Sequence, residues 1–247
     1  MTTKQVITAG FVMIGDEILS GRTVDKNLNF LALNLAEIGI NLQEVRVVPD
    51  NENEIIDAVN SLRKKFDYVF TSGGIGPTHD DITSLSISKA FGEELIKNHE
   101  AAEILAQYYG KDNLNDARMK MAFVPKSAKL LDNPVSSAPG FRIANVFVMA
   151  GVPKIFQAML EAAKKELIGG KKTKTKEIKI SLVESSIARD LTDLQEKYSQ
   201  VKMGSYPFAG GTSLVFRSID YDALEQSVKE MIEVLERIKE GSIINID

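Results

Sequence analysis

Short apolar runs alternate with longer stretches in which apolar residues recur at helical spacing. The runs at 6–14, 68–71 and 146–150 are typical of strands buried on both faces, whereas 42–48 alternates polar and apolar positions like a half-exposed strand. Doubly buried strands separated by helices are typical of parallel sheets that helices cover on both sides. The pattern therefore predicts an α/β fold of three layers, α/β/α, around a mostly parallel sheet.

Apolar spacing and capping residues predict the helices of this region. Leu28, Leu31 and Leu35 lie on one helical face. Asn51, followed three residues later by Glu54, is typical of a capping box that begins a helix reaching about residue 65. Further helices are expected at 82–91, 98–109, 115–122 and 153–167, with a hairpin near 129–140.

The composition changes at Gly169. Residues 164–179 hold seven lysines and two glutamates, which we interpret as a solvated linker rather than a phosphate-binding segment. Beyond it the pattern predicts strands and helices in β-α-β-β-α order, at 177–183, 186–199, 201–206, 213–218 and 222–240. The last helix would begin with a capping box of Asp222 and Glu225. We therefore predict a first domain at 1–168, a linker at 169–176 and a small α+β domain at 177–247.

Composition limits the chemistry further. The chain has 247 residues and a net charge of −4, and this acidic balance argues against nucleic acid or a membrane surface as the main partner. The lack of cysteine excludes disulfides, zinc–thiolate sites and thiol nucleophiles, and two histidines exclude a multi-histidine metal site. The sequence shows no signal peptide and no apolar run of membrane length, so we expect a soluble cytoplasmic protein.

Chemistry is expected where the parallel strands end, because ligands of such sheets bind in the crevice outside the carboxyl ends of the strands. The loops predicted there are 15–21, 49–51, 72–83 and 151–153, and each is rich in glycine or carboxylate. In the third loop, Gly73, Gly74 and Gly76 allow positive φ angles, which turn backbone amides toward a ligand and form a nest for phosphate oxygens. Helix-start amides at Ile82 and Thr83 would add partial positive charge. The loop is neither a P-loop nor a GxGxxG motif.

Carboxylates flank this loop on both sides of the crevice. Asp80 and Asp81 either begin the following helix or share a divalent cation with a phosphate. Asp16 and Glu17 either begin a helix or turn, or join Asp50 and Asp81 in an oxygen-only site suited to magnesium, manganese or cobalt. The residues alone therefore favour metal-assisted phosphate or pyrophosphate chemistry.

These loops also resemble a family signature. The run from Thr71 to Thr83, with its Gly-Pro-Thr-x-Asp-Asp form, is similar to the hallmark of the molybdenum-cofactor-biosynthesis (MoCF) domain. This motif resembles the one found in the branch of the family that contains competence/damage-inducible protein A and the N-terminal domain of eukaryotic FAD synthase. Four other segments of the chain resemble further motifs of that branch and occur in the same order. They are Gly15–Gly21 with Asn27, Asn133-Pro134, Ala138–Phe141 and Gly151–Pro153. The resemblance spans 5–168, and 204–207 is similar to the small domain that follows in the FAD synthase branch.

The resemblance implies a MogA-like fold whose crevice binds molybdopterin or an adenine nucleotide. In the family's molybdopterin adenylyltransferases two aspartates serve the transfer, and these match Asp50 and Asp81 here. For the damage-inducible branch the implied activity is metal-dependent hydrolysis of the pyrophosphate in ADP-ribose, FAD or similar dinucleotides. The expected metal ligands are Asp16, Glu17 and Asp81. The expected phosphate- and ligand-binding residues are Gly15, Ser20, Asn27, Gly73, Gly74, Gly76, Thr78, Asp80, Thr83, Gly140 and Gly151.

Two other functions stay open. Nucleotidyl transfer to molybdopterin would use the same crevice, and a non-catalytic protein would hold a pterin or nucleotide without turnover. The hypothesis of binding without turnover rests on Lys154, which occupies a position where the family usually has glutamate. The amidase and FAD-synthesising domains of relatives are not found, so we expect this chain not to make FAD. Family members form dimers and trimers, and the resemblance implies a homo-oligomer with a small-molecule nucleotide or pterin as its partner.

Overall fold

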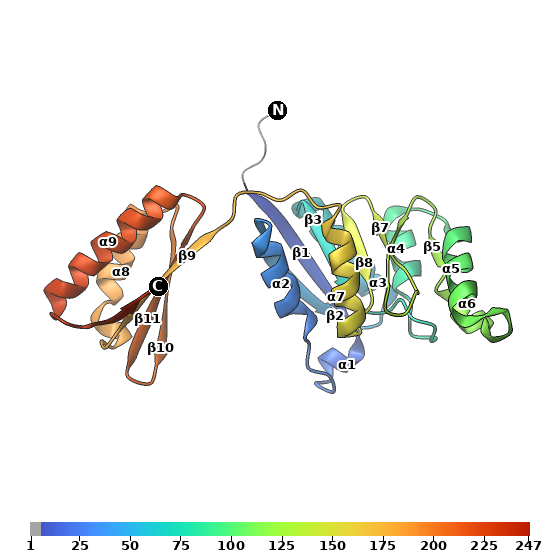
Figure 1. The fold of residues 1–247 in the computed structure, drawn as a ribbon, viewed down its shortest axis with the longest axis horizontal. Helices are drawn as coiled ribbons and strands as arrows, with labels where there is room; N and C mark the ends of the chain where they lie inside the picture. The colour runs from blue at the N-terminus through green and yellow to red at the C-terminus, as the bar shows by residue number, and fades with distance from the viewer. Residues whose placement is uncertain (1–5) are drawn as a thin grey trace, which may run out of the picture. The chain divides into compact units, whose positions relative to one another are not determined.

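The chain divides into two compact units between Gly170 and Lys171 (Figure 1). The structure is a computed structural model that describes residues 6–247. The strand expected at 177–183 begins earlier, at Lys174, so the segment between the units is shorter than the sequence indicates. Within the described residues, no helix is long and apolar enough to cross a membrane.

A six-stranded sheet forms the centre of the first unit. Its strands are β1 (Ile7–Ile14), β2 (Ile40–Val48), β3 (Tyr68–Ser72), β6 (Lys129–Leu131), β7 (Gly140–Ile143) and β8 (Val146–Met149). The order is β2-β1-β3-β8-β7-β6; the first four are parallel, and β7 and β6 continue the sheet antiparallel. Because β2 and β3 lie on opposite sides of β1, the strand order reverses there, and a ligand crevice is expected at the carboxyl ends of β1 and β3.

Helices cover both faces of this sheet, as Figure 1 shows. They are α2 (Asn27–Glu37), α3 (Glu52–Lys65), α4 (Thr83–Phe91) and α7 (Pro153–Lys164). On one face of β3, Phe70 belongs to a core with Leu31 of α2 and Phe156 of α7. On the other face, Val69 belongs to a core with Ile55 of α3 and Ile87 of α4. The three-layer α/β/α fold predicted from the sequence is confirmed.

The chain between α4 and β6 makes an excursion that the sequence predicted only in part. Helices α5 (His99–Tyr109) and α6 (Asp116–Lys120) lie within the expected ranges. The strands β4 (Leu95–Lys97) and β5 (Phe123–Pro125) form a separate antiparallel pair that was not expected. Strands of three residues are too short to show an alternation in the sequence.

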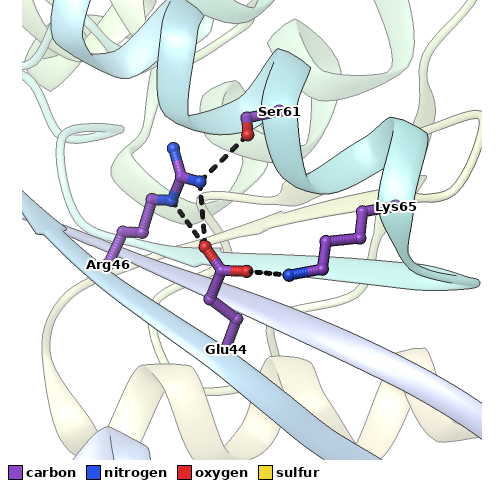
Figure 2. Close-up of polar contacts among 4 residues, drawn as sticks. All are labelled: Glu44, Arg46, Ser61 and Lys65. Carbon is purple, nitrogen blue, oxygen red and sulfur yellow. Dashed lines mark hydrogen bonds and ion pairs between the residues drawn. The ribbon is translucent and has the colours of Figure 1, made fainter.

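Polar contacts join the edge strand β2 to α3 (Figure 2). Glu44 accepts hydrogen bonds from Lys65 Nζ (2.7 Å) and Arg46 Nε (2.9 Å), and Arg46 Nη2 also donates to Ser61 Oγ (2.9 Å). The Lys65 hydrogen bond, followed by that of Arg46, lowers the pKa of Glu44. A lowered carboxyl pKa adds stability above the ordinary carboxyl pKa, and that stability is lost as the pH falls through the lowered value. Because these groups are partly exposed, we expect less than about 1 kcal/mol from them.

The second unit contains a four-stranded antiparallel sheet in the order β10-β11-β9-β12. Its elements are β9 (Lys174–Ile180), α8 (Ala188–Lys197), β10 (Lys202–Phe208), β11 (Gly211–Ser218), α9 (Tyr221–Ile238) and β12 (Ile243–Ile246). Leu194 of α8 and Leu224 of α9 share one core with Ile178 and Phe216 of the sheet. The predicted small α+β unit is confirmed, but the sequence analysis missed β12.

The helix caps were predicted correctly at one place and wrongly at another. Asn51 caps α3 as expected, because its side chain accepts the amides of Asn53 (3.0 Å) and Glu54 (3.3 Å). The predicted capping box of Asp222 and Glu225 is wrong. Helix α9 begins one residue earlier, and Asp220 is its cap, with Oδ1 accepting the Ala223 amide at 3.1 Å. Two aspartates two residues apart compete for this role, and spacing alone does not distinguish them.

Replacing Asp220 by alanine is expected to destabilise α9 by about 1 kcal/mol, because an amide of the first turn loses its acceptor. The Asp222→Ala variant is the matched control, since Asp222 lies inside the helix and is exposed. Hydrogen exchange of α9 peptides, followed by mass spectrometry on the full chain, measures the difference. Equal acceleration in the two variants would contradict the assignment of the cap.

Candidate functional site

The candidate site begins where β1 and β3 end side by side. Gly73, directly after β3, has a φ of +111°, and a Cβ there would lie 2.1 Å from the carbonyl oxygen of Ile14. Its amide donates to the carbonyl of Met149 at the end of β8 (3.1 Å). Gly74 follows with a φ of +69°. Only glycine fits this path, because the backbone is left-handed and no space remains for a side chain.

Thr83 closes the glycine loop. Its hydroxyl donates to the carbonyl of Gly73 (3.0 Å), and its amide donates to the carbonyl of Gly74 (2.9 Å). The Thr83 side chain is fully buried. The sequence analysis assigned Thr83 to phosphate binding, whereas here its hydroxyl and its amide are both used to hold the loop in shape.

Asp81 is oriented by the loop that precedes it. Its Oδ2 accepts the Thr78 amide (2.8 Å) and the Thr78 hydroxyl (2.5 Å). A Cβ on Gly76 would lie 2.7 Å from the same oxygen, so glycine at 76 leaves room for this carboxylate. The ammonium group of Lys120, at the end of α6, donates to the carbonyl of Thr78. Lys120 thus brings a positive charge to the loop from the excursion.

Asp80 lies close to the same hydroxyl. The Thr78 hydroxyl and then the amide of Asp80 itself hold the pKa of Asp80 below its usual value. A hydroxyl donates only one proton, so the two carboxylates compete for it, and the 2.5 Å distance to Oδ2 favours Asp81. Asp80 is exposed and stays ionised at neutral pH.

Four carboxylates line one polar pocket of about 390 Å³, which we call the acidic pocket. They are Glu17, Asp50, Asp80 and Asp81. Gly15 is part of the wall, and a Cβ on it would lie 2.4 Å from Glu17 Oε2, so this glycine makes room for the Glu17 carboxylate. The pocket therefore brings together three of the predicted loops.

Asp50 lies in an environment that raises its pKa. Its Oδ2 accepts the amide of Asp16, the first residue of α1 (Asp16–Leu19), at 3.0 Å. Burial raises the pKa of Asp50, the Asp16 amide lowers it, and the negative charges of Asp16, Glu17 and Asp80 raise it further, so that the pKa lies above its usual value. The charges therefore repel one another across the pocket, and a cation would relieve this repulsion.

A second, mostly apolar cleft of about 570 Å³ adjoins the acidic pocket; we call it the apolar cleft. The two share Glu17, Thr23, Gly74 and Asp81. The apolar cleft is lined by Gly73, Ile75, Gly76, Pro77, Tyr109, Met121, Asn133, Ala138, Gly151, Val152, Pro153, Ile155 and Met159, among others. A site in which an apolar cleft meets a charged pocket suits a ligand with a ring at one end and phosphates at the other.

Asn27 and Gly151 hold the wall behind the glycine loop. Asn27 is buried, and its Nδ2 donates to Ser72 Oγ (2.8 Å) and to the carbonyl of Gly151 (2.8 Å). Gly151 also approaches Gly73, because a Cβ on it would lie 3.3 Å from the Gly73 Cα. Asn27 Oδ1 has no hydrogen-bond partner among the described residues. Asn27 thus ties α2 to the ends of β3 and β8.

Several predicted residues line neither pocket. The side chain of Asp16 does not, and its contribution is the amide that binds Asp50. Ser20 ends α1, its amide donating to the carbonyl of Asp16 (2.9 Å). Gly140 lies within β7, where a Cβ would be 2.6 Å from the carbonyl oxygen of Val148. Thr78 acts through Asp81. The structure therefore places Ser20 in the turn that ends α1 and Gly140 in the sheet, outside the lining of both pockets.

Other residues of the site were missed by the sequence analysis. Arg22 lines the acidic pocket and Thr23 lines both pockets; both directly follow the first glycine-rich motif, and that position was the available signal. Tyr109 and Met121 reach the apolar cleft from the excursion. No local pattern in the sequence points to Tyr109, because nothing there indicates that α5 borders the crevice.

The residues fit a divalent cation in their chemistry but are not gathered around one. Within residues 6–247, no group of three or more His, Asp or Glu side chains is arranged to hold a metal ion. Glu17, Asp80 and Asp81 nevertheless offer carboxylate oxygens to the same pocket. Magnesium and manganese prefer oxygen ligands. The repulsion between Asp50 and the neighbouring carboxylates favours the binding of a cation.

Comparisons with known proteins agree with this fold and identify its family. Residues 10–169 match the family described as "Probable molybdopterin binding domain", and residues 172–246 match "FAD synthase, middle domain". The crystal structure of CinA from Thermoplasma acidophilum, a protein of unknown function, has 35% sequence identity and a TM-score of 0.62. That likeness covers 66% of this chain and 99% of the other.

Relatives extend over both units. A protein of Pyrococcus furiosus is 33% identical over 90% of this chain and 95% of its own length. A probable FAD synthase of Caenorhabditis briggsae is 34% identical over 84% of this chain, which corresponds to only 45% of that longer protein. The chain therefore belongs to the family of the probable molybdopterin binding domain, joined here to a unit that matches the middle domain of FAD synthase.

Proposed function

We propose that the chain is a divalent-metal-dependent pyrophosphatase that cleaves an adenine dinucleotide of the ADP-ribose or FAD type. The observation that carries this proposal is the meeting of the apolar cleft and the acidic pocket at Glu17, Thr23, Gly74 and Asp81. The apolar cleft suits the adenine ring, or the pterin ring that the family description names. The pyrophosphate would then lie where the two pockets join.

Binding would use the loop backbone and two cations. Gly74 lines both pockets, so the backbone of the glycine loop borders the place where the pyrophosphate would lie. Arg22 in the acidic pocket and Lys120, whose ammonium group donates to the Thr78 carbonyl, would offset part of the charge of the pyrophosphate. Four carboxylates exceed these two cations, so the pocket needs further positive charge when an anion enters.

A divalent cation would supply that charge and polarise the phosphoryl group, with Glu17, Asp80 and Asp81 as the residues that would hold it. Asp50 is the general base in this proposal, since burial and neighbouring charges raise its pKa toward the range in which a carboxylate accepts a proton more readily. Water adds to one phosphorus and the bridging P–O bond breaks, so that AMP and a second phosphate monoester leave.

Lys154 gives no support to the alternative of binding without turnover. It is exposed in the first turn of α7 and lines neither the acidic pocket nor the apolar cleft. The departure from the family pattern at this position therefore stays outside the proposed chemistry.

The wild-type protein should release AMP from ADP-ribose, FAD or NAD in the presence of magnesium, manganese or cobalt. Replacing Asp81 by alanine should lower the rate at least about 100-fold, since a charged group held at the reacting centre is lost. Chromatography of AMP over time measures both. The control is Asp57→Ala, an exposed aspartate of α3 that lines neither pocket. AMP formed from ATP only when molybdopterin is supplied would instead favour adenylyl transfer, and no AMP with any metal would contradict hydrolysis.

Replacing Asp50 by asparagine should lower the hydrolysis rate by about 100-fold or more while leaving the fold at least as stable. Asparagine still accepts the Asp16 amide but cannot take a proton from water. Because the folded state raises the pKa of Asp50, the ionised carboxylate costs stability at pH values above that pKa. The melting temperature at pH 7 without divalent cations should therefore stay equal or rise. A large loss of stability would show that Asp50 is mainly structural.

A further inference from the structure

A third pocket adjoins the glycine loop. It has a volume of about 300 Å³, and we call it the outer pocket. Its lining is mostly apolar and consists of Ile75, Gly76, Asp81, Ser84, Leu85, Leu95, Asp116, Lys120 and Phe123. Three of these residues, Ile75, Gly76 and Asp81, also line the apolar cleft, so the two spaces adjoin at the loop.

Beyond the loop residues, the outer pocket draws on α4 and on the strand pair β4 and β5, which the proposed chemistry does not use. Leu85 comes from the first turn of α4, while Leu95 and Phe123 come from the strand pair β4 and β5. Leu85 is 38% exposed, so its side chain is accessible to a ligand in this pocket. The ammonium group of Lys120 donates to the carbonyl of Thr78. The pocket therefore has a mostly apolar lining that also includes one cation, Lys120, and two carboxylates, Asp81 and Asp116.

The three pockets meet at a single carboxylate. Asp81 lines the acidic pocket, the apolar cleft and the outer pocket. Two apolar lobes and one charged lobe thus extend from the point where the pyrophosphate would lie. A dinucleotide with a ring system in each half has the same arrangement, with two flat apolar groups joined through a charged centre. ADP-ribose has only one such ring.

We propose that the outer pocket binds the second ring system of a dinucleotide, so that the site prefers a substrate with aromatic rings in both halves, such as FAD, over one with a single ring. This inference rests on the proposed function, because the pyrophosphate is taken to lie beside Asp81. The outer pocket and the apolar cleft share residues of the glycine loop. One ligand can therefore occupy both, and this continuity favours the second ring of the dinucleotide as the occupant of the outer pocket. Flat rings gain from an apolar surface because each has a π-face to stack.

FAD and ADP-ribose are the probes, because both contain the AMP half and differ in what lies beyond the pyrophosphate. Replacing Leu85 by glutamate places a charge at the mouth of the outer pocket at a partly exposed position, where folding tolerates it. The dissociation constant for FAD should rise about tenfold, whereas that for ADP-ribose should change less than about twofold. Leu33→Glu is the matched control, an exposed leucine (61%) on α2 that lines neither lobe.

Equilibrium binding and AMP release are measured on the same full-length variants. A loss of affinity for FAD but not for ADP-ribose in the Leu85→Glu variant supports ring binding in the outer pocket, whether or not AMP is formed. An unchanged ratio of the two dissociation constants overturns ring binding there. If AMP is still released in that case, the proposed hydrolysis is unaffected. Selective binding without AMP would leave the outer pocket and overturn hydrolysis. Failure of both probes to bind the wild-type protein would overturn both proposals.

Discussion

The close approach of the glycine loop to the end of β1 is the constraint on which the site depends. Any side chain at Gly73 would collide with the Ile14 carbonyl, and any at Gly74 with Thr83, whose nearest atom would lie 2.1 Å away. Because no side chain stands there, β1 and β3 end in contact and their following loops converge. This contact places Glu17 from the first loop and Asp81 from the third on the same two pockets.

That convergence has an electrostatic consequence. Four carboxylates share a pocket whose lining offers one guanidinium, Arg22, and Asp50 shows the effect, with burial and the charges of Asp16, Glu17 and Asp80 raising its pKa. Carboxylates whose pKa values are shifted by burial and neighbouring charges cluster at functional sites. In the proposed function a cation and a pyrophosphate enter together, and the charge of each compensates that of the other.

The sequence predicted what periodicity and glycine control. The α/β/α layers follow from doubly buried strands, and Gly73 and Gly74 were located because only glycine takes their backbone path. Spacing does not distinguish two aspartates that lie two residues apart, so Asp222 was chosen over Asp220 as a cap. Spacing also does not show that the Asp16 amide binds Asp50 while the Asp16 side chain lines neither pocket. Nor could the sequence reveal Tyr109, Met121 and Lys120, because the excursion reaches the crevice through tertiary packing that no local pattern encodes.

The central claim is that the carboxylates around the glycine loop form a cation-assisted anion site, and the ionisation of Asp50 tests it most directly. Carbon NMR of ¹³C-labelled aspartate side chains, assigned with the Asp50→Asn variant, would follow this carboxyl during a pH titration. The account predicts a pKa above the usual aspartate value of 3.8 without divalent ions and a clear fall when magnesium or manganese is added. An ordinary pKa without the metal, or a raised pKa that the metal leaves unchanged, would contradict it.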